Sequence, residues 1–375
     1  MARKRSNSWQ VSTPEVSLRT IDGCNIVFSS SHQKVYELNE AAALIWRSLH
    51  NGRADGNAEK QLVAMGLPPS TAGAFVRTML SELSRLGIRP PPAARARPPS
   101  GGKRLQYVIE VAGLTICFRF GSQQALSRAG IFSHLAASGS APDMVIDVIG
   151  RGQEQHVYRN GHWLDACAEE ELAPFLKALL MTEILASSHY ELALHAATLA
   201  HNERLLLLCG RPGAGKTTLT LALAHAGLGF AGDDLALVRA NGTVTGVPFP
   251  AAVKPGSWPL IARRFPELRC AITHRRPDGR RVRYVVPRSS AGPFGHTVGW
   301  VVFLERQRTL ERATLSPLPV SRALEGLLDG AHTHDSRLTT RGFSALVDCI
   351  AEARYFTLSY ADLEDATRVL LRGCR

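Results

Sequence analysis

The chain has 375 residues, of which 45% are hydrophobic, and this is enough for two or three domains that each bury a core. No apolar run approaches the roughly 20 residues that cross a bilayer, and the basic start MARKRSNSWQ lacks the apolar segment of a secretory signal. We therefore expect a soluble, cytoplasmic protein with no membrane partner. The seven scattered cysteines form no CxxC pair, which argues against a zinc site or a disulfide framework. The net charge of +12 fits an acidic peptide or a polyphosphate ligand as well as it fits nucleic acid.

The first elements along the chain predict a small domain in which strands precede helices. VSLRTIDGCNIVFSS and KVYELN have strand character, and NEAAALIWRSLH has the apolar spacing of a helix capped by Asn39. Two more helices are expected near Ala58 to Met65 and Ser70 to Leu86. Strands and helices in this order are typical of an α+β domain of winged-helix type, which we place at residues 1–90.

A linker and a second, larger domain follow. In RPPPAARARPPSGGKR, from Arg89 to Arg104, proline, glycine and arginine replace apolar periodicity, so we expect a solvated linker over 91–104. LQYVIEVAGLTICFRFG, MVIDVIG and HVYRNGHWLDA then predict strands, with a turn at Asn160-Gly161, and Glu169 to Ala197 has helical character. The apolar run ERLLLLCG predicts a buried strand. The sequence thus predicts an α/β domain over 105–375, in a chain that is α+β overall.

GRPGAGKTT fits the phosphate-binding P-loop pattern G-x-x-x-x-G-K-[ST] and joins a predicted strand to a predicted helix. The glycines would turn backbone amides toward phosphate oxygens, the lysine would supply a positive charge, and the Thr217 hydroxyl would serve magnesium. A glycine-rich turn without a ligand is the alternative. We predict that ATP and Mg²⁺ bind here, with a nucleotide site made of Gly210, Arg211, Pro212, Gly213, Ala214, Gly215, Lys216, Thr217 and Thr218.

Two adjacent carboxylates, Asp233 and Asp234, interrupt the apolar run GLGFAGDDLALV. A buried pair of carboxylates is costly without cations, so magnesium and a reacting hydroxyl would suit this position. The alternative is a solvated turn, because Gly-Asp is a common turn dipeptide.

Four further side chains could belong to the site. His195, in ELALHAATLA, lies before the strand that leads to the P-loop, although a lone histidine in an apolar run is more often a core residue. Lys254, Arg281 and Arg283 are cations that could close over a triphosphate or a substrate. Solvated or edge-strand charges explain these three cations equally well.

Together these residues resemble the HPr kinase/phosphorylase superfamily, whose kinase core shares a fold with phosphoenolpyruvate carboxykinases. The family pattern has LH, a strand, the P-loop and an aspartate pair, which match Leu194-His195, Leu205 to Leu208, Gly210 to Thr217 and Asp233-Asp234. The resemblance implies that Asp233 is the general base toward a serine-type hydroxyl, that Thr217 and Asp234 serve the metal, and that His195 lies near the transferred phosphoryl group. The P-loop pattern itself assigns Lys216 to the β- and γ-phosphates. The downstream signature of bifunctional family members, of the LExRG type, is missing from this sequence, and the most similar stretch is LERQ from Leu304. The resemblance therefore does not extend to reverse phosphorylase activity, hexameric assembly or HPr as the substrate.

The N-terminal region refines this expectation. VYELNEAAALIWRSLHNG, from Val35 to Gly52, and SELSRLGI, ending at Ile88, resemble the PqqD-type recognition element for precursor peptides, in which a leader adds a strand to a small sheet. The whole chain therefore resembles lasso-peptide tailoring kinases, and the resemblance implies an ATP-dependent Ser/Thr-type kinase of a ribosomally made precursor peptide. Trp46 is expected in the core.

Other readings remain open at this point. The chain could be a nucleotide-switched leader chaperone without transfer activity, a DNA-binding regulator with an ATPase domain, or another phosphotransferase of the carboxykinase fold. Nucleic acid is the less favoured partner, and assembly into a homo-oligomer stays undecided.

Overall fold

The computed structural model describes residues 16–21, 23–29, 34–50, 55–86, 104–139, 141–187, 189–288, 295–307, 309–333 and 337–374. The predicted linker over 91–104 lies outside this range except for Arg104, and so does the basic N-terminal start. The chain divides into two compact units. The first comprises Met1–Gln106, Phe118–Ala125 and Met144–Glu169, and the second comprises Tyr107–Cys117, Leu126–Asp143 and Glu170–Arg375. No helix in the described part of the chain is long and apolar enough to cross a membrane.

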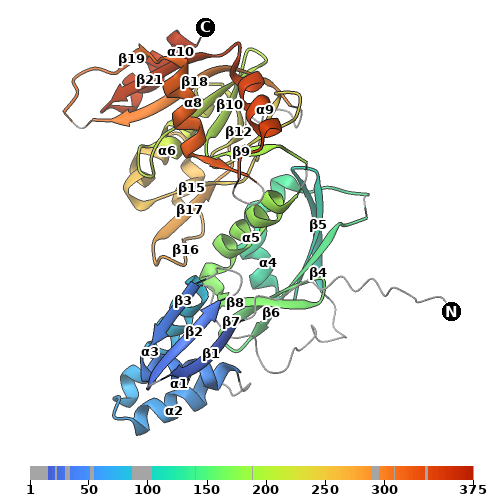
Figure 1. Cartoon of the computed structure of the whole chain (residues 1–375), viewed down its shortest axis with the longest axis vertical. Helices are drawn as coiled ribbons and strands as arrows, with labels where there is room; N and C mark the ends of the chain where they lie inside the picture. The colour runs from blue at the N-terminus through green and yellow to red at the C-terminus, as the bar shows by residue number, and fades with distance from the viewer. Residues whose placement is uncertain are drawn as a thin grey trace, which may run out of the picture. The chain divides into compact units, whose positions relative to one another are not determined.

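The N-terminal part of the first unit is an antiparallel sheet of order β1-β2-β3 followed by three helices (Figure 1). The side chain of Asn39 accepts a hydrogen bond of 2.9 Å from the Ala42 amide, which caps the first helix as expected. Trp46 is 4% exposed and belongs to the core between helices and sheet, as predicted. The elements are β1 (Val16–Ile21), β2 (Cys24–Ser29), β3 (Lys34–Leu38), α1 (Glu40–His50), α2 (Asp55–Ala64) and α3 (Pro69–Arg85).

The first unit also contains an antiparallel meander of β6 (Met144–Arg151), β7 (Glu154–Arg159) and β8 (His162–Ala168). Asn160 and Gly161 connect β7 to β8 with φ angles of 48° and 81°. Two consecutive positive φ angles are the geometry of a type I′ hairpin turn, which Asn-Gly favours, so the predicted turn is confirmed. The strands β4 (Leu105–Val111) and β5 (Leu114–Phe120) straddle the division between the units.

The centre of the second unit is a six-stranded sheet of order β12-β10-β11-β18-β21-β19 (Figure 1). Its three middle strands, β11 (Arg204–Cys209), β18 (Thr297–Arg306) and β21 (Arg354–Tyr360), run parallel. Antiparallel strands flank them, namely β12 (Gly229–Gly232), β10 (Ala197–His201) and β19 (Thr314–Pro317).

Both faces of this sheet are covered, which explains why β11 is apolar from Leu205 to Cys209. Leu206 and Leu208 belong to one core with α6 (Lys216–His225) and α10 (Leu363–Gly373). The alternate residues Leu205 and Leu207 belong to a second core, to which α8 (Val320–Asp329) and α9 (Thr340–Ile350) contribute. The α/β character expected for this part of the chain, and the α+β character of the whole, are confirmed.

Two small sheets complete the second unit, with strand orders β14-β13-β9-β20 and β15-β17-β16. The other α-helices and strands of this unit are α5 (Leu172–Ala186), β9 (Leu192–Leu194), β13 (Ala236–Val238), β14 (Val244–Gly246), β15 (Ala251–Val253), α7 (Trp258–Ile261), β16 (His274–Arg275), β17 (Arg281–Val285) and β20 (Ala331–His332). The helix α4 (Gln123–Ala129) straddles the division between the units.

The helix expected from Glu169 to Ala197 is shorter than predicted. It ends at Ala186, where two hydroxyl groups take the carbonyl groups of the last turn: Ser187 donates to the Ile184 carbonyl over 2.7 Å, and Tyr190 donates to the Leu185 carbonyl over 2.5 Å. The chain then extends into β9, so that part of the prediction is wrong.

Candidate active site

The glycine-rich loop joins the buried end of β11 to the first residue of α6, in the strand, loop and helix order that a P-loop requires. Gly213 and Gly215 have φ angles of 90° and 96°, in the left-handed region where glycine carries no steric penalty. Gly215 is the residue before α6. The loop therefore ends at the positive pole of the α6 dipole, where amide groups without helical partners attract an anion.

Tyr360, at the end of β21, fixes this loop from outside the motif. Its hydroxyl donates a hydrogen bond of 2.6 Å to the Ala214 carbonyl, and a side chain at Gly215 would collide with the same hydroxyl. Tyr360 is 3% exposed, so the phenol is packed as well as bonded. The shape of the loop thus depends on a strand that is distant in sequence.

The Lys216 side chain folds back onto the start of the loop. Its ammonium group donates to the Gly210 carbonyl over 2.6 Å, and the residue is 8% exposed. Burial lowers the pKa of Lys216 below its usual value, although Asp233 and Asp234 act in the opposite direction. This influence places the aspartate pair and the P-loop lysine in one electrostatic environment.

Asp233 and Asp234 follow directly after β12, which adds a strand beside β10 in the central sheet. Asp233 is 1% exposed, and among the described residues no group meets either of its carboxylate oxygens with hydrogen-bond geometry. Burial raises the pKa of Asp233 to about 7, with a further contribution from Asp234, while Lys177 and the Thr217 hydroxyl lower it. Asp233 is therefore a poorly solvated acid that releases its proton near neutral pH.

Lys177 supplies the cation that a buried pair of carboxylates needs. This residue of α5 is 6% exposed, and its ammonium lies 2.5 Å from Oδ2 of Asp234 and 3.8 Å from Oδ1 of Asp233. It also donates to the Pro250 carbonyl over 3.0 Å. Burial alone would lower the pKa of Lys177, but the two carboxylates outweigh burial and raise it above its usual value. Lys177 in turn overcomes the effect of burial on Asp234, whose pKa is lowered.

Sequence reasoning missed Lys177. The helix LAPFLKALLMTEILA is otherwise mostly apolar, so its single lysine could have indicated a buried cation. A buried lysine needs an acidic partner. The partner could not be inferred, because Asp234 is far away in sequence.

His195 lies between β9 and β10, beyond the observed end of the helix that was expected over Glu169 to Ala197, and its ring contacts the aspartate pair. Its Nδ1 is 3.0 Å from the backbone carbonyl of Asp234, so Nδ1 carries the proton in this contact because a carbonyl only accepts. Burial, and next the charge of Lys216, lower the pKa of His195, which keeps the ring neutral at neutral pH. A neutral ring with Nδ1 protonated leaves Nε2 as a free acceptor.

The other predicted residues differ in their surroundings. Thr218 and Ser257 share a hydrogen bond of 2.9 Å between their hydroxyls. Arg283 is fully engaged in structure: its guanidinium donates to the carbonyls of Leu268 and Arg269 and stacks over the Trp258 ring at 4.3 Å. Lys254 is exposed and near enough to Lys216 to lower its pKa. Arg281 is exposed at the start of β17, where it pairs with Arg275 of β16.

The residues present fit a nucleotide with one associated cation. The glycine cradle offers amides and the Lys216 ammonium to phosphate oxygens. The Thr217 hydroxyl and the Asp234 carboxylate are hard ligands of the kind Mg²⁺ prefers, and they lie beside the Asp233 oxygens, which have no hydrogen-bond partner among the described residues. Across the described part of the chain, no three His, Cys, Asp or Glu side chains converge to hold a metal by themselves. A metal at this position would thus take part of its coordination from phosphate, as Mg²⁺ commonly does.

No family model matches the chain, and no curated protein matches it. Among solved structures, the HPr(Ser) kinase/phosphatase from Coxiella burnetii is similar to 48% of this chain and 89% of its own, with 9% sequence identity and a TM-score of 0.23. A TM-score this low carries no argument about activity, so the functional conclusion has to come from the site.

Proposed function

We propose that this chain is an ATP- and Mg²⁺-dependent kinase that phosphorylates a Ser/Thr-type hydroxyl of a ribosomally made precursor peptide. The observation that supports it most is Asp233, a buried carboxylate with a pKa of about 7 whose oxygens have no hydrogen-bond partner among the described residues. It shares its surroundings with Lys216 and Thr217 of the phosphate loop. A loop without catalytic function would gain nothing from such an unfavourable group.

Each residue around the phosphate loop would have one role in phosphate or metal binding. The amides at the start of α6 and the Lys216 ammonium would bind the β- and γ-phosphates, and Thr217 with Asp234 would hold the cation. Bound Mg²⁺ would neutralise the charge that develops on the phosphates. Lys177 would share Asp234 and keep its carboxylate ionised.

Asp233 would accept the proton of the attacking hydroxyl. A general base works best when its pKa lies near the working pH, and the value of about 7 meets this condition. His195, neutral and with Nε2 free to accept, would lie beside the transferred group and orient it.

A peptide acceptor is supported by the first unit. Its small sheet has two edges, β1 and β3, and an extended leader could pair with one of them. Phe28 and Val35 face each other across β2 and β3 and are 37% and 64% exposed. An exposed cross-strand apolar pair of this kind suits the side chains of a docked peptide. Leader binding would then raise the local concentration of the acceptor hydroxyl.

The test is incubation of the full chain with γ-labelled ATP, Mg²⁺ and a library of serine- and threonine-containing peptides, with phosphopeptides identified by mass spectrometry. We expect transfer by the native protein and none by Lys216→Ala or Asp233→Asn. Transfer that persists in Asp233→Asn would remove that residue as the base. ATP hydrolysis without phosphopeptide would instead support a nucleotide-driven chaperone.

A further inference from the structure

The ammonium group of Lys177 lies among three oxygen atoms next to the phosphate loop. These are Oδ2 of Asp234 at 2.5 Å, the Pro250 carbonyl oxygen at 3.0 Å and Oδ1 of Asp233 at 3.8 Å. Carboxylates and backbone carbonyls are also the ligands that bind hard divalent cations in proteins. The ammonium therefore occupies a position whose surroundings have the chemistry of a metal site.

Aromatic rings and burial close the rest of this position. The ammonium lies 5.9 Å from the centroid of the Phe249 ring and 5.9 Å from that of the Tyr284 ring, within the range of cation–π attraction. Lys177 and Asp233 are 6% and 1% exposed, so little water reaches them. A metal ion that bridged the two carboxylates on this side would fall where the ammonium already lies, and the two cations would repel each other.

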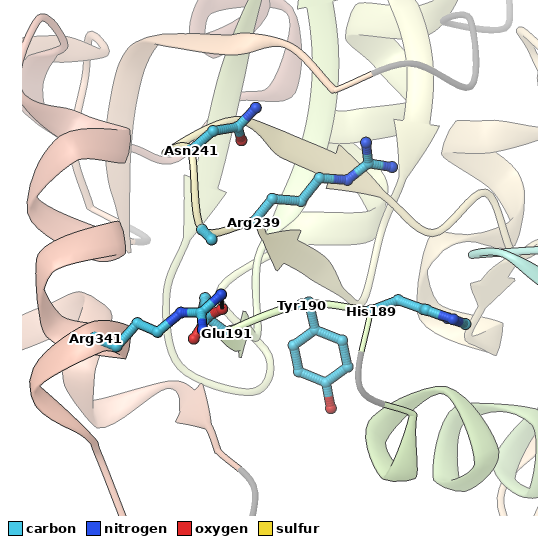
Figure 2. A pocket seen from close by; sticks show the side chains of 7 residues that line it. His189, Tyr190, Glu191, Arg239, Asn241 and Arg341 are labelled. Atoms are coloured by element: carbon cyan, nitrogen blue, oxygen red, sulfur yellow. Dashed lines mark ion pairs between the residues drawn. The ribbon is translucent and has the colours of Figure 1, made fainter.

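An ion pair elsewhere in the second unit shows the difference that burial makes. Figure 2 shows Glu191 and Arg341, which lie 2.8 Å apart at a pocket lined mainly by exposed residues. The Arg341 side chain is 73% exposed, so water and salt screen its charge. The Lys177 side chain is 7% exposed, so its charge acts on the aspartate pair with little screening.

The aspartate pair still has a second side on which a cation can bind. Thr217, in the first turn of α6, acts on the Asp233 carboxylate from the phosphate loop. The contact with Lys177 uses Oδ2 of Asp234, whose side chain remains 29% exposed. The other oxygen of Asp234 is therefore left for the Mg²⁺ ion that accompanies the nucleotide in the proposed function.

We propose that Lys177 occupies the position of a second metal ion, so that this site binds ATP with one Mg²⁺ ion instead of two. The inference rests on the proposed nucleotide site and adds a metal stoichiometry to it. Enzymes of phosphoryl transfer that use two ions hold them about 3.5 to 4 Å apart with shared carboxylates. Lys177 is a positioning residue here, because its charge acts through the two carboxylates and is present before any metal binds.

Counting bound metal tests this proposal without any phosphoryl transfer. Mn²⁺ replaces Mg²⁺ as a paramagnetic probe, and EPR measures the Mn²⁺ bound per full chain at saturating imido analogue of ATP. We expect the native protein to bind one ion and Lys177→Ala to bind two. Two ions about 3.5 to 4 Å apart are spin-coupled, so the spectrum of Lys177→Ala should also broaden. Lys60→Ala, the same change at an exposed lysine of α2, is the matched control and should bind one ion.

Thermal denaturation without nucleotide is the second measurement, because the loss of Lys177 destabilises the protein. A ligand that binds only the folded state stabilises it, so Mn²⁺ at about ten times its Kd should raise the Tm of Lys177→Ala by about 4 °C. The corresponding shift in the native protein and in Lys60→Ala should be smaller.

Two ions bound by the native protein would overturn the proposal, and this measurement needs no variant. No more than one ion bound by folded Lys177→Ala, or equal Mn²⁺-induced shifts of Tm in Lys177→Ala and Lys60→Ala, would also overturn it. Counts of one for the native protein and two for Lys177→Ala, without phosphopeptide in the transfer assay, would keep the proposal and remove the kinase activity.

Discussion

Replacing Asp233 by asparagine is expected to stabilise the nucleotide-free protein at alkaline pH, although the same change should abolish transfer. Burial and the neighbouring carboxylate raise the pKa of this residue from 3.8 to about 7. Its folded state therefore binds a proton more tightly than its unfolded state. The associated stability is fully present below a pH of about 3.8 and is lost as the pH rises to about 7.

The size of the effect follows from this shift. Each pKa unit corresponds to about 1.4 kcal/mol, so the ionised Asp233 costs the folded protein up to about 4 kcal/mol above pH 7. The opposing attraction of Lys177 is already contained in the pKa of about 7. Between pH 5 and pH 8 the native protein should lose about 2.6 kcal/mol relative to Asp233→Asn, which has no such proton to release.

Urea denaturation at pH 5 and at pH 8 measures this difference as a free energy of unfolding. Asp329→Asn, at an exposed position at the end of α8, is the control and should show no pH-dependent difference from the native protein. The free energies of unfolding of Asp233→Asn and the native protein could instead differ by the same amount at both pH values. The pKa of the buried carboxyl would then not lie near 7, and the argument for Asp233 as a base near neutral pH would fail.

Four other predictions concern single contacts. Lys177→Met should lower the free energy of unfolding by about 3 to 5 kcal/mol, because it leaves a buried carboxylate pair without its cation, and adding Asp234→Asn should recover much of the loss in a denaturation experiment. Tyr360→Phe should weaken ATP binding about three- to tenfold in calorimetry through loss of one hydrogen bond to the loop, and unchanged affinity would dissociate the phenol from the shape of the loop. Lys216→Met should reduce kcat/KM by at least about a hundredfold in steady-state assays. Val35→Asp should weaken the binding of a precursor peptide but leave ATP hydrolysis intact, and a change in both would contradict separate roles.

The parts of the site that the sequence could predict are those encoded locally. The glycines and the lysine of the P-loop stand together in one short motif, so the motif alone predicts the phosphate site. A strand buried on both faces has to be apolar, and the apolar run before the loop therefore predicted β11. The Asn39 cap and the Asn160-Gly161 turn are likewise determined by a few neighbouring residues. Each such prediction needs only a short stretch of chain.

Contacts between distant segments could not be predicted in the same way. Lys177 of α5 contacts the aspartate pair that follows β12, and Tyr360 at the end of β21 contacts the loop that follows β11, so each contact joins segments that are far apart in the sequence. The end of α5 was missed because side-chain hydroxyls, rather than a proline or a glycine, stop the helix. Arg283 looked available from its spacing, but its guanidinium is taken by carbonyl groups and the Trp258 ring.

The hydrogen bond from Tyr360 to the loop has a consequence for the order in which the protein matures during synthesis. β21 lies between β18 and β19 in the central sheet, so β19 cannot join the sheet until β21 has been made. A chain released before Arg354 would contain every residue of the phosphate-binding motif, yet nothing would hold the Ala214 carbonyl. The nascent protein would therefore acquire a fully shaped nucleotide loop only after β21 has been made.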